Sequence, residues 1–453
     1  MKTGIIKTKS FVNCGFRFDP DIHLSEGVQV RQSINNLPYE ISNIGENAEK
    51  VFYGNIFSRV FVEKPEFGVP YLAASDTILS ELETGKYISK KQADDLEYLK
   101  LEKDWILITC SGTLGNVSYT NNNYVGRLAT HDLIRVIPND NKVLRGVLYA
   151  FLAGKYGYHQ ITQSQFGGVV KHVNEEQTKD IMVPVFPKEF QNKIDLLIKE
   201  SSSLREQATK ILKEATQYFD NMVVVKREIT KTFTKSVKSL KKSWAAYNNN
   251  LEVTDGVEQY KEHSIQLKDV TSDIFAPPMF KHIYLSKDNG YPFMTGGELV
   301  KQCMRYYRWL SPRGVKNIKD YVVDKDTLLI YRHGSIDGGM NGQVFIVDDA
   351  LRGCCLSDLI IRVKFFEPKL ALWAFAFFKS AFGRRYLLSF PSGTAIPFMA
   401  IDRIEDAYIP SPDHNFDKIV EIVRNYMTQS ALSKKKEIEA IELVEQEIEK
   451  WNN

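Results

Sequence analysis

Apolar side chains recur every three or four residues from Phe190 to Met222, with charged side chains between them. The pattern is sustained over about four heptads and predicts a coiled-coil helix. At about 1.5 Å per residue, this helix would span roughly 50 Å. Its expected seam consists of Ile194, Leu197, Ser201, Leu204, Ala208, Ile211, Ala215, Tyr218 and Met222.

A second run of the same kind begins at Phe416 and continues to Trp451. Each run follows a proline-containing entry, VPVFPKEF for the first helix and YIPSPDHNF for the second. Proline keeps the residue before it extended and ends the preceding element. The seam expected for the second helix includes Val420, Val423, Met427, Ile438, Ile441 and Ile448. A long segment precedes each helix, and this order indicates a duplicated chain.

Sequence matches between the two halves support the duplication. GVPYLAASD from Gly68 matches GYPFMTGGE from Gly290, at an offset of 222 residues. LEKDWILITCSGTLG from Leu101 matches VDKDTLLIYRHGSID from Val323 at the same offset. Three further pairs follow in the same order: HDLIRV with SDLIIRV, LYAFLAGKYG with LWAFAFFKSAFG, and GGVVKHV with SGTAIPF. Five ordered matches at nearly one offset are not a chance result.

Each repeat is predicted to be a mixed α/β (α+β) unit. Short apolar runs predict the buried strands Ile106–Ile108, Leu133–Ile137, Leu328–Ile330 and Leu359–Phe365. Apolar spacings of three and four predict helices over Leu144–Lys155 and Leu370–Phe382. We therefore expect globular domains over residues 1–187 and 227–412, with spacer helices over 188–226 and 413–453.

Composition places few limits on the function. The chain has 453 residues, 43% of them hydrophobic and 25% charged, as is ordinary for a globular protein. A net charge of +3 permits nucleic-acid binding without indicating it. Five cysteines without CxxC spacing predict free thiols in a reducing compartment. No signal peptide or membrane-length apolar run is apparent, and we expect a cytoplasmic protein without membrane contact.

The segment 226–242 is strongly basic, with seven Lys and Arg residues and one acid, Glu228. Such a segment between two domains is consistent with a solvated linker. It is also consistent with an arm that contacts phosphates.

No catalytic or metal-binding signature is present. The chain lacks GxxxxGK[ST], GxGxxG after a strand, HExxH and zinc spacing, so we expect no metal site. Cys110 and His131 lie near each other in the sequence, yet the second repeat has Arg332 and Ser357 at those positions. A shared catalytic set would be present in both copies. The Ala276-Pro277-Pro278-Met279 segment resembles the Asn/Asp-Pro-Pro-aromatic turn of adenine methyltransferases but lacks its polar first residue.

Polar side chains on the turns differ between the repeats, whereas the strand residues agree. Arg, Lys, Asn and Gln suit base edges, and Ser, Thr and Lys often hold phosphates. Two copies of one scaffold with different surfaces would read two different targets. The candidate DNA-binding residues are Asn55, Ser58, Arg59, Ser111, Thr113, Gln163, Gln165, Lys171 and His172 in the first repeat, and Arg332, His333, Ser335, Asn341, Arg384, Arg385 and Ser392 in the second.

The chain resembles the specificity (S) subunit of type I restriction-modification systems over nearly its whole length. The order of module, heptad helix, module and heptad helix is similar to that family. So are particular stretches: GNIFSR, GVPYLAASD, CSGTLGNV, and FGGVVKHV followed by IMVPVFP. SGTAIPF replaces GGVVKHV in the second module, where the resemblance is weaker.

This resemblance implies two target recognition domains separated by two long antiparallel coiled-coil helices. It implies a non-catalytic subunit that reads a bipartite, gapped double-stranded DNA sequence. Two methyltransferase subunits would dock on the helices, and restriction subunits can join them. No cofactor is implied in this chain; S-adenosylmethionine, ATP and Mg would act in the partner subunits. A spacer of roughly 50 Å exceeds one turn of B-DNA, about 34–36 Å.

Two other interpretations remain open from the sequence. A two-lobed coiled-coil adaptor without DNA readout would explain the helices but not the variable turns. A self-contained nuclease would need a clustered carboxylate–lysine metal site, which the sequence does not indicate.

Overall fold

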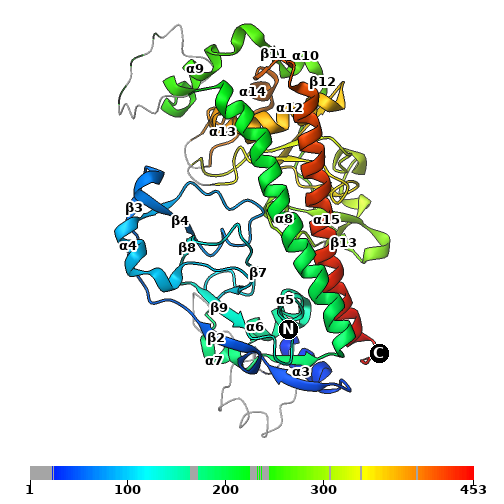
Figure 1. Cartoon of the computed structure of the whole chain (residues 1–453). Helices are drawn as coiled ribbons and strands as arrows, with labels where there is room; N and C mark the ends of the chain where they lie inside the picture. The colour runs from blue at the N-terminus through cyan, green and yellow to red at the C-terminus, as the bar shows by residue number, and fades with distance from the viewer. Residues whose placement is uncertain are drawn as a thin grey trace. The chain divides into compact units, whose positions relative to one another are not determined.

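Short runs of branched apolar residues form the central strands of each half of the chain. Strands β6 (Ile106–Thr109) and β16 (Leu328–Tyr331) lie inside four-stranded sheets, and their apolar side chains are almost fully buried. Figure 1 shows the computed structural model. It describes residues 23, 25–163, 172–224, 232, 234, 236, 244–305, 308–336, 339–393 and 396–452.

The chain divides into two units that share two long helices. Unit 1 comprises the residues up to Glu206 together with those from Ser433 onward, and unit 2 comprises Gln207–Leu432. Helices α8 (Lys188–Met222) and α15 (Phe416–Glu449) each contribute one part to unit 1 and one part to unit 2.

Unit 1 contains three antiparallel or mixed sheets. They are β2-β9-β6-β7, β3-β5-β4-β8 and the pair β1-β10, and only β4 and β8 run parallel within the described sheets of this unit. The remaining elements of the unit are α3 (Glu26–Asn35), β1 (Glu40–Asn43), β2 (Ala48–Phe52), β3 (Phe61–Val62), β4 (Gly68–Leu72), β5 (Tyr87–Ser89), α4 (Lys90–Asp95), β7 (Val117–Tyr119), β8 (Leu128–Ala129), β9 (Leu133–Pro138), α5 (Arg145–Ala153), α6 (Lys155–Gln163), α7 (Glu175–Lys179) and β10 (Met182–Val185).

Unit 2 repeats this plan strand for strand. Its sheets are β12-β19-β16-β17, β13-β15-β14-β18 and the pair β11-β20, with β14 and β18 parallel. Its elements are α9 (Leu251–Glu258), β11 (Ser264–Gln266), α10 (Leu267–Val270), β12 (Thr271–Phe275), β13 (Tyr284–Leu285), β14 (Tyr291–Met294), α11 (Gly296–Leu299), β15 (Arg308–Leu310), β17 (Val344–Ile346), β18 (Cys355–Leu356), β19 (Ile360–Phe365), α12 (Pro368–Lys379), α13 (Ala381–Leu388), α14 (Ile401–Glu405) and β20 (Tyr408–Pro410).

The two units share details that confirm the repeat. Asp104 and Asp326, 222 residues apart, both have left-handed backbone, with φ of 64° and 63°. A non-glycine residue rarely adopts this conformation, so its presence at matching turns is informative. The same offset relates two ion pairs: Lys86 lies 2.9 Å from Asp76, and Arg308 lies 2.5 Å from Glu298.

Each unit also buries an arginine on an inner strand of one four-stranded sheet, β2-β9-β6-β7 in unit 1 and β12-β19-β16-β17 in unit 2. Arg135 on β9 and Arg362 on β19 have exposed fractions of 0% and 1%. The Arg135 guanidinium donates to the carbonyl oxygens of Leu133, Ala129 and Thr130 at 3.0–3.1 Å. Arg362 donates in the same way to carbonyl oxygens within residues 356–360. Burial lowers the pKa of each guanidinium to about 10, so both remain charged at neutral pH.

The long helices predicted from the heptad pattern are confirmed as α8 and α15. In unit 1, Ser201 in the first half of α8 hydrogen-bonds Ser433 in the second half of α15. In unit 2, Phe219 in the last turns of α8 belongs to one core cluster with Ile419 in the first turns of α15. The pairing is therefore antiparallel, and the predicted mixed α/β fold with two repeated lobes is confirmed.

The buried stripe of each helix differs in part from the predicted seam. Ile194, Ala208, Ala215, Val420, Val423, Met427, Ile441 and Ile448 are buried, whereas Leu197, Leu204, Ile211 and Ile438 are half-buried. On α8, the neighbouring residues Ile198, Leu212 and Phe219 are buried instead.

Contacts with the globular lobes explain this shift. Asp195 of α8 accepts a hydrogen bond from the backbone N–H of Gly146 on α5 at 3.0 Å. In unit 2, the ring of Phe219 lies 4.8 Å from that of Trp373 on α12. Each part of the helix thus packs against its lobe as well as against the partner helix, and the buried face turns toward both.

None of the helices in the described part of the chain is long and apolar enough to cross a membrane. Among the described residues, Cys110, Cys303, Cys354 and Cys355 are not joined by disulfide bonds.

Candidate nucleic-acid interface

In unit 1, the turn after β6 is held against the segment that begins at His172. Ser111 and His172 form an isolated antiparallel bridge, and the backbone N–H of Val173 donates to the carbonyl oxygen of Cys110 at 3.1 Å. Gly112, at the exposed turn itself, has a φ of 69°, which glycine adopts without strain. The predicted residues Ser111 and His172 are therefore adjacent although 61 positions separate them.

Arg59 lies at the end of the loop that joins β2 to β3. Its Nε donates to the hydroxyl of Tyr71 at 2.6 Å, and its Nη2 donates to Thr130 Oγ1 at 3.1 Å. The Asp132 carboxylate is 3.9 Å away, and the Phe57 ring centroid lies 5.7 Å from the guanidinium carbon. The side chain keeps 35% of its surface exposed. A guanidinium fixed in this way presents its remaining N–H donors in a defined direction, which suits bidentate recognition.

The same loop carries Asn55 and Ser58, which are both exposed. The backbone N–H of Asn55 donates to the Tyr98 hydroxyl at 3.3 Å, and the carbonyl oxygen of Ser58 accepts from Gln92 Nε2 at 2.6 Å. Backbone contacts thus hold the loop while these two side chains face solvent. Thr113 is also exposed, and its carbonyl oxygen accepts from the Thr109 hydroxyl at 2.6 Å.

Gln163 has a different environment. It ends α6 with 8% of its surface exposed, and its Oε1 accepts from Arg31 Nε of α3 at 3.2 Å. The backbone of Gly27 approaches so closely that a Cβ there would lie 2.5 Å from Gln163 Cβ. Gln163 therefore joins α3 to α6. Gln165 and Lys171, together with the seven basic residues of segment 226–242, lie outside the described residues.

Unit 2 brings Arg332 and His333 to the corresponding turn after β16. His333 forms an isolated bridge with Phe398, and the backbone N–H of Met399 donates to the Arg332 carbonyl oxygen at 2.8 Å. The Arg332 guanidinium lies 4.8 Å from the centroid of the Phe398 ring. Burial lowers the pKa of Arg332, while the Asp358 carboxylate acts in the opposite direction. Unit 2 thus repeats the backbone arrangement of unit 1 with different side chains.

The other candidates in unit 2 divide into exposed and engaged residues. Ser335 and Ser392 are exposed, and the backbone of Ser392 pairs with that of Phe398. Asn341 is fully buried and donates through Nδ2 to the carbonyl oxygens of Gly334 and Pro397, at 3.1 and 3.0 Å. Asn341 therefore holds the turn itself.

Two arginines on α13 complete the predicted set. Arg385 forms an ion pair with Glu252 of α9, so its charge is balanced within unit 2. Arg384 is half-buried on the same helix.

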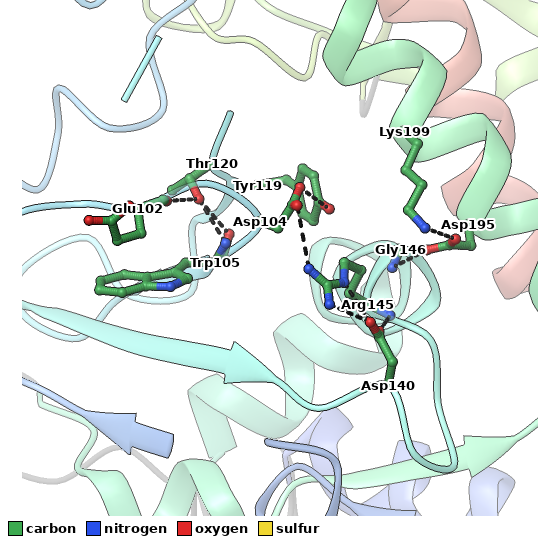
Figure 2. A network of polar contacts seen from close by, with 10 residues as sticks. All are labelled: Glu102, Asp104, Trp105, Tyr119, Thr120, Asp140, Arg145, Gly146, Asp195 and Lys199. Carbon is green, nitrogen blue, oxygen red and sulfur yellow. Dashed lines mark hydrogen bonds and ion pairs between the residues drawn. The ribbon is translucent and has the colours of Figure 1, made fainter. Parts of the chain in front are cut away.

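A polar network that sequence reasoning missed fixes the lobe of unit 1 to α8 (Figure 2). Arg145 Nε donates to Asp140 Oδ2 at 2.7 Å, and Arg145 Nη1 lies 3.4 Å from Asp104 Oδ2. Asp195 accepts from the Gly146 N–H and pairs with Lys199 at 2.6 Å. The sequence contained one indication of this network, because Asp104 matches Asp326 in the aligned repeats.

The arrangement of Cys110, His131 and Asp132 is not that of an activated nucleophile. Burial, reinforced by the Asp132 carboxylate, raises the pKa of Cys110 to about 12. A reactive cysteine needs its thiolate form near neutral pH. His131 packs its ring 5.7 Å from that of Phe57. Within the part of the chain that the structure describes, no group of three or more His, Cys, Asp or Glu residues could hold a metal ion.

The sequence profile of the type I restriction modification DNA specificity domain matches the chain twice, over residues 36–214 and 262–443. The chain belongs to this family. Each match covers one repeat and most of the long helix that follows it. This specificity subunit therefore selects a DNA target, and catalysis is the work of other subunits in the system.

Solved structures similar to this specificity subunit include three chains. The type I restriction-modification S subunit from M. genitalium is 12% identical with a TM-score of 0.35, and the match covers 92% of this chain and 96% of that chain. The HsdS subunit from Thermoanaerobacter tengcongensis is 15% identical with a TM-score of 0.28, and the match covers 92% of this chain and 97% of that chain. A chain from a structure of complex assembly and conformational transition of the type I R-M system is 13% identical with a TM-score of 0.27, and the match covers 92% of this chain and 97% of that chain. A search of curated proteins finds no significant match. The assignment rests on the family profile.

Proposed function

We propose that each lobe of this specificity subunit reads one part of a bipartite double-stranded DNA sequence and that the bases between the two parts are not read. The observation that supports this is the pair of matching turns after β6 and β16. Both are held by the same backbone bridge, Ser111 with His172 and His333 with Phe398. The exposed side chains on the two turns differ, so two lobes of one plan would select different bases.

In this proposal, the DNA-contacting set in unit 1 is led by Asn55, Ser58 and Arg59. Arg59 is the strongest candidate for a base contact, because Tyr71 and Thr130 fix its guanidinium while leaving part of it exposed. Ser111, Thr113 and His172 extend this surface. In unit 2 the corresponding set is Arg332, His333, Ser335 and Ser392, with Arg384 nearby in sequence. The engaged residues Gln163, Asn341 and Arg385 support the lobes.

The partners in this proposal are two methyltransferase subunits that dock on the pair of long helices, to which restriction subunits can be added. Those subunits would supply the S-adenosylmethionine chemistry on adenine and the ATP- and Mg-dependent cleavage. The domain boundaries we assign are 1–187 and 227–412 for the lobes, with 188–226 and 413–453 for the helices. The complex would act on DNA in the cytoplasm.

Single-molecule methylation mapping tests the proposal directly. Host DNA is mapped with this chain present beside its neighbouring methyltransferase, and again after deletion of the chain. We expect a gapped, two-part adenine motif that disappears on deletion. Unchanged methylation would contradict DNA readout, and it would favour the two-lobed adaptor without sequence recognition.

A further inference from the structure

Two loops of equal length occupy the same place in the two units. Residues 53–60 join β2 to β3, and residues 276–283 join β12 to β13. Their sequences, YGNIFSRV and APPMFKHI, share only a phenylalanine at the fifth position and contain no acidic residue. The fourth position carries a large apolar residue in each, Ile56 in the first loop and Met279 in the second.

These fourth-position side chains project into solvent. Ile56 is 87% exposed and Met279 is 88% exposed, the highest values among the large hydrophobic residues that the structure describes. A lone exposed apolar side chain is ordinary on a protein surface. Two chain segments with different sequences have nevertheless retained one at the same loop position, which is the observation that carries the inference.

The residue after each tip anchors its loop. The Phe57 ring lies 5.7 Å from the His131 ring. The Phe280 ring lies 4.4 Å from the Tyr321 ring and 6.0 Å from the Phe293 ring. Each loop therefore places one hydrophobic side chain inward and the preceding one outward, and the fold does not require the outward one.

Hydrogen bonds and close packing hold both loops against their lobes and make each a platform for its tip. In the first, Gly54 is buried where a Cβ would lie 2.7 Å from Leu99, and the Val60 N–H donates to Gln92 Oε1 at 2.9 Å. In the second, the Pro278 carbonyl oxygen accepts from the Tyr321 hydroxyl at 3.0 Å. A side chain that enters another molecule must be held by such a platform, because ordering a mobile loop on binding costs entropy.

The charges beside the tips favour a nucleic-acid partner. Arg59 follows Ile56 by three positions, and Lys281 follows Met279 by two. Proteins that bind and bend DNA through its minor groove combine Arg and Lys contacts with apolar wedges, among them Ile, Met, Leu, Phe and Pro, inserted between neighbouring base pairs.

We propose that Ile56 and Met279 are wedge residues, each of which inserts into the base stack of one half of the DNA target and unstacks one base step. This proposal rests on the proposed function, because it requires each lobe to contact its own half-site. It adds a contribution to specificity that needs no hydrogen bond, since flexible pyrimidine–purine steps are easier to unstack than others.

Fluorescence of 2-aminopurine tests the wedge in the complex of this chain with its methyltransferase partner. The probes are duplexes that carry the mapped two-part motif, with 2-aminopurine, an adenine analogue, substituted in turn for each adenine of either strand except the methylated adenines. Those adenines are excluded because methyltransferases flip their target base. We expect increased fluorescence at one step in each half. Ile56→Ala should remove the signal in one half only, Met279→Ala should remove it in the other only, and each should weaken binding about tenfold.

Matched variants keep the outcomes distinct. Ile56→Leu should retain the fluorescence signal. Phe366→Ala removes a different exposed hydrophobic side chain, which is 72% exposed, and should leave the signal in both halves unchanged. If the wild-type complex binds the motif without any fluorescence increase, the wedge is wrong and the proposed function stands. If the complex does not bind the motif, the proposed function fails. If Ile56→Ala instead impairs assembly with the methyltransferase on gel filtration while the signal persists, the tip contacts protein and the wedge is again wrong.

Discussion

The hydroxyl of Ser201 on α8 donates to the carbonyl oxygen of Ser433 on α15, and the hydroxyl of Ser433 donates to the carbonyl oxygen of Ser201, each over 2.8 Å. Both side chains are buried, with 2% of each exposed. The reciprocal bonds satisfy two polar groups and also allow close approach of the helices. In a coiled-coil seam, such a buried polar pair favours one register over its alternatives.

Enlarging this position should destabilise unit 1. Ser201→Leu would force a bulky side chain into a well-packed seam and remove the hydroxyl that donates to the Ser433 carbonyl oxygen. We expect a loss of about 1–3 kcal/mol in the free energy of unfolding, measured by urea titration. Lys193→Leu, at an exposed position of the same helix, is the control and should change it by less than about 0.5 kcal/mol. Equal effects of the two variants would show that the seam is not closely packed.

The stability of unit 1 should depend strongly on the ion pair between the buried Glu437 and Arg205. The Glu437 side chain is 2% exposed, lies 2.8 Å from Arg205 Nη2 and accepts a hydrogen bond from the Tyr149 hydroxyl. Arg205→Ala would leave a buried carboxylate without its cation, which costs about 3–5 kcal/mol. The double variant Arg205→Met with Glu437→Leu removes both charges and should recover most of that loss in the same urea titration. A double variant as unstable as Arg205→Ala would contradict the explanation.

Arg59 should influence sequence choice in one half of the target. Arg59→Ala removes the fixed guanidinium, and Arg59→Lys keeps the charge without its planar set of donors. We expect methylation mapping to show relaxed preference at one position of one half-site for both variants. The exposed Lys103→Ala serves as a control and should leave the motif unchanged. Loss of preference in both halves at once would argue against independent readout.

The thiols of Cys110 and Cys355 should resist alkylation in the folded protein. Burial raises the pKa of each to about 12 from an ordinary value of 9.0. Iodoacetamide at pH 8.5 should therefore label them only after unfolding, as mass spectrometry can measure. Because the folded state favours the neutral thiol, this contribution to stability is complete below about pH 9 and is lost as the pH rises toward 12. Rapid labelling of the folded protein would show that these sites open readily.

Five ordered sequence matches predicted the repeat, and hydrophobic periodicity predicted the central strands and both long helices. It failed by one residue on α8, where Ile198 rather than Leu197 is buried, because a pattern along one helix does not reveal the lobe that packs beside it. The predicted helices over Leu144–Lys155 and Leu370–Phe382 each end and restart, at Gly154 and Ser380.

The candidate site was predictable where strands determine position. Ser111 directly follows a strand, and the repeat alignment places His333 at the equivalent turn. The functions of Gln163, Asn341 and Arg385 could not be predicted, because their partners Arg31, Pro397 and Glu252 lie far away in the sequence.

The buried arginines Arg135 and Arg362 also bear on how the repeated chain evolved. Burying a guanidinium is costly unless its donors are satisfied, so two independent inventions of the same carbonyl cage on equivalent strands would be improbable. The cage must therefore be older than the event that doubled the ancestral segment. The cations near the equivalent aspartates, Asp132 and Asp358, come from different elements, Arg59 before β3 and Arg332 after β16, so this feature differs between the two copies. Comparing the two halves of this single chain thus separates the inherited framework from the residues by which its lobes diverged.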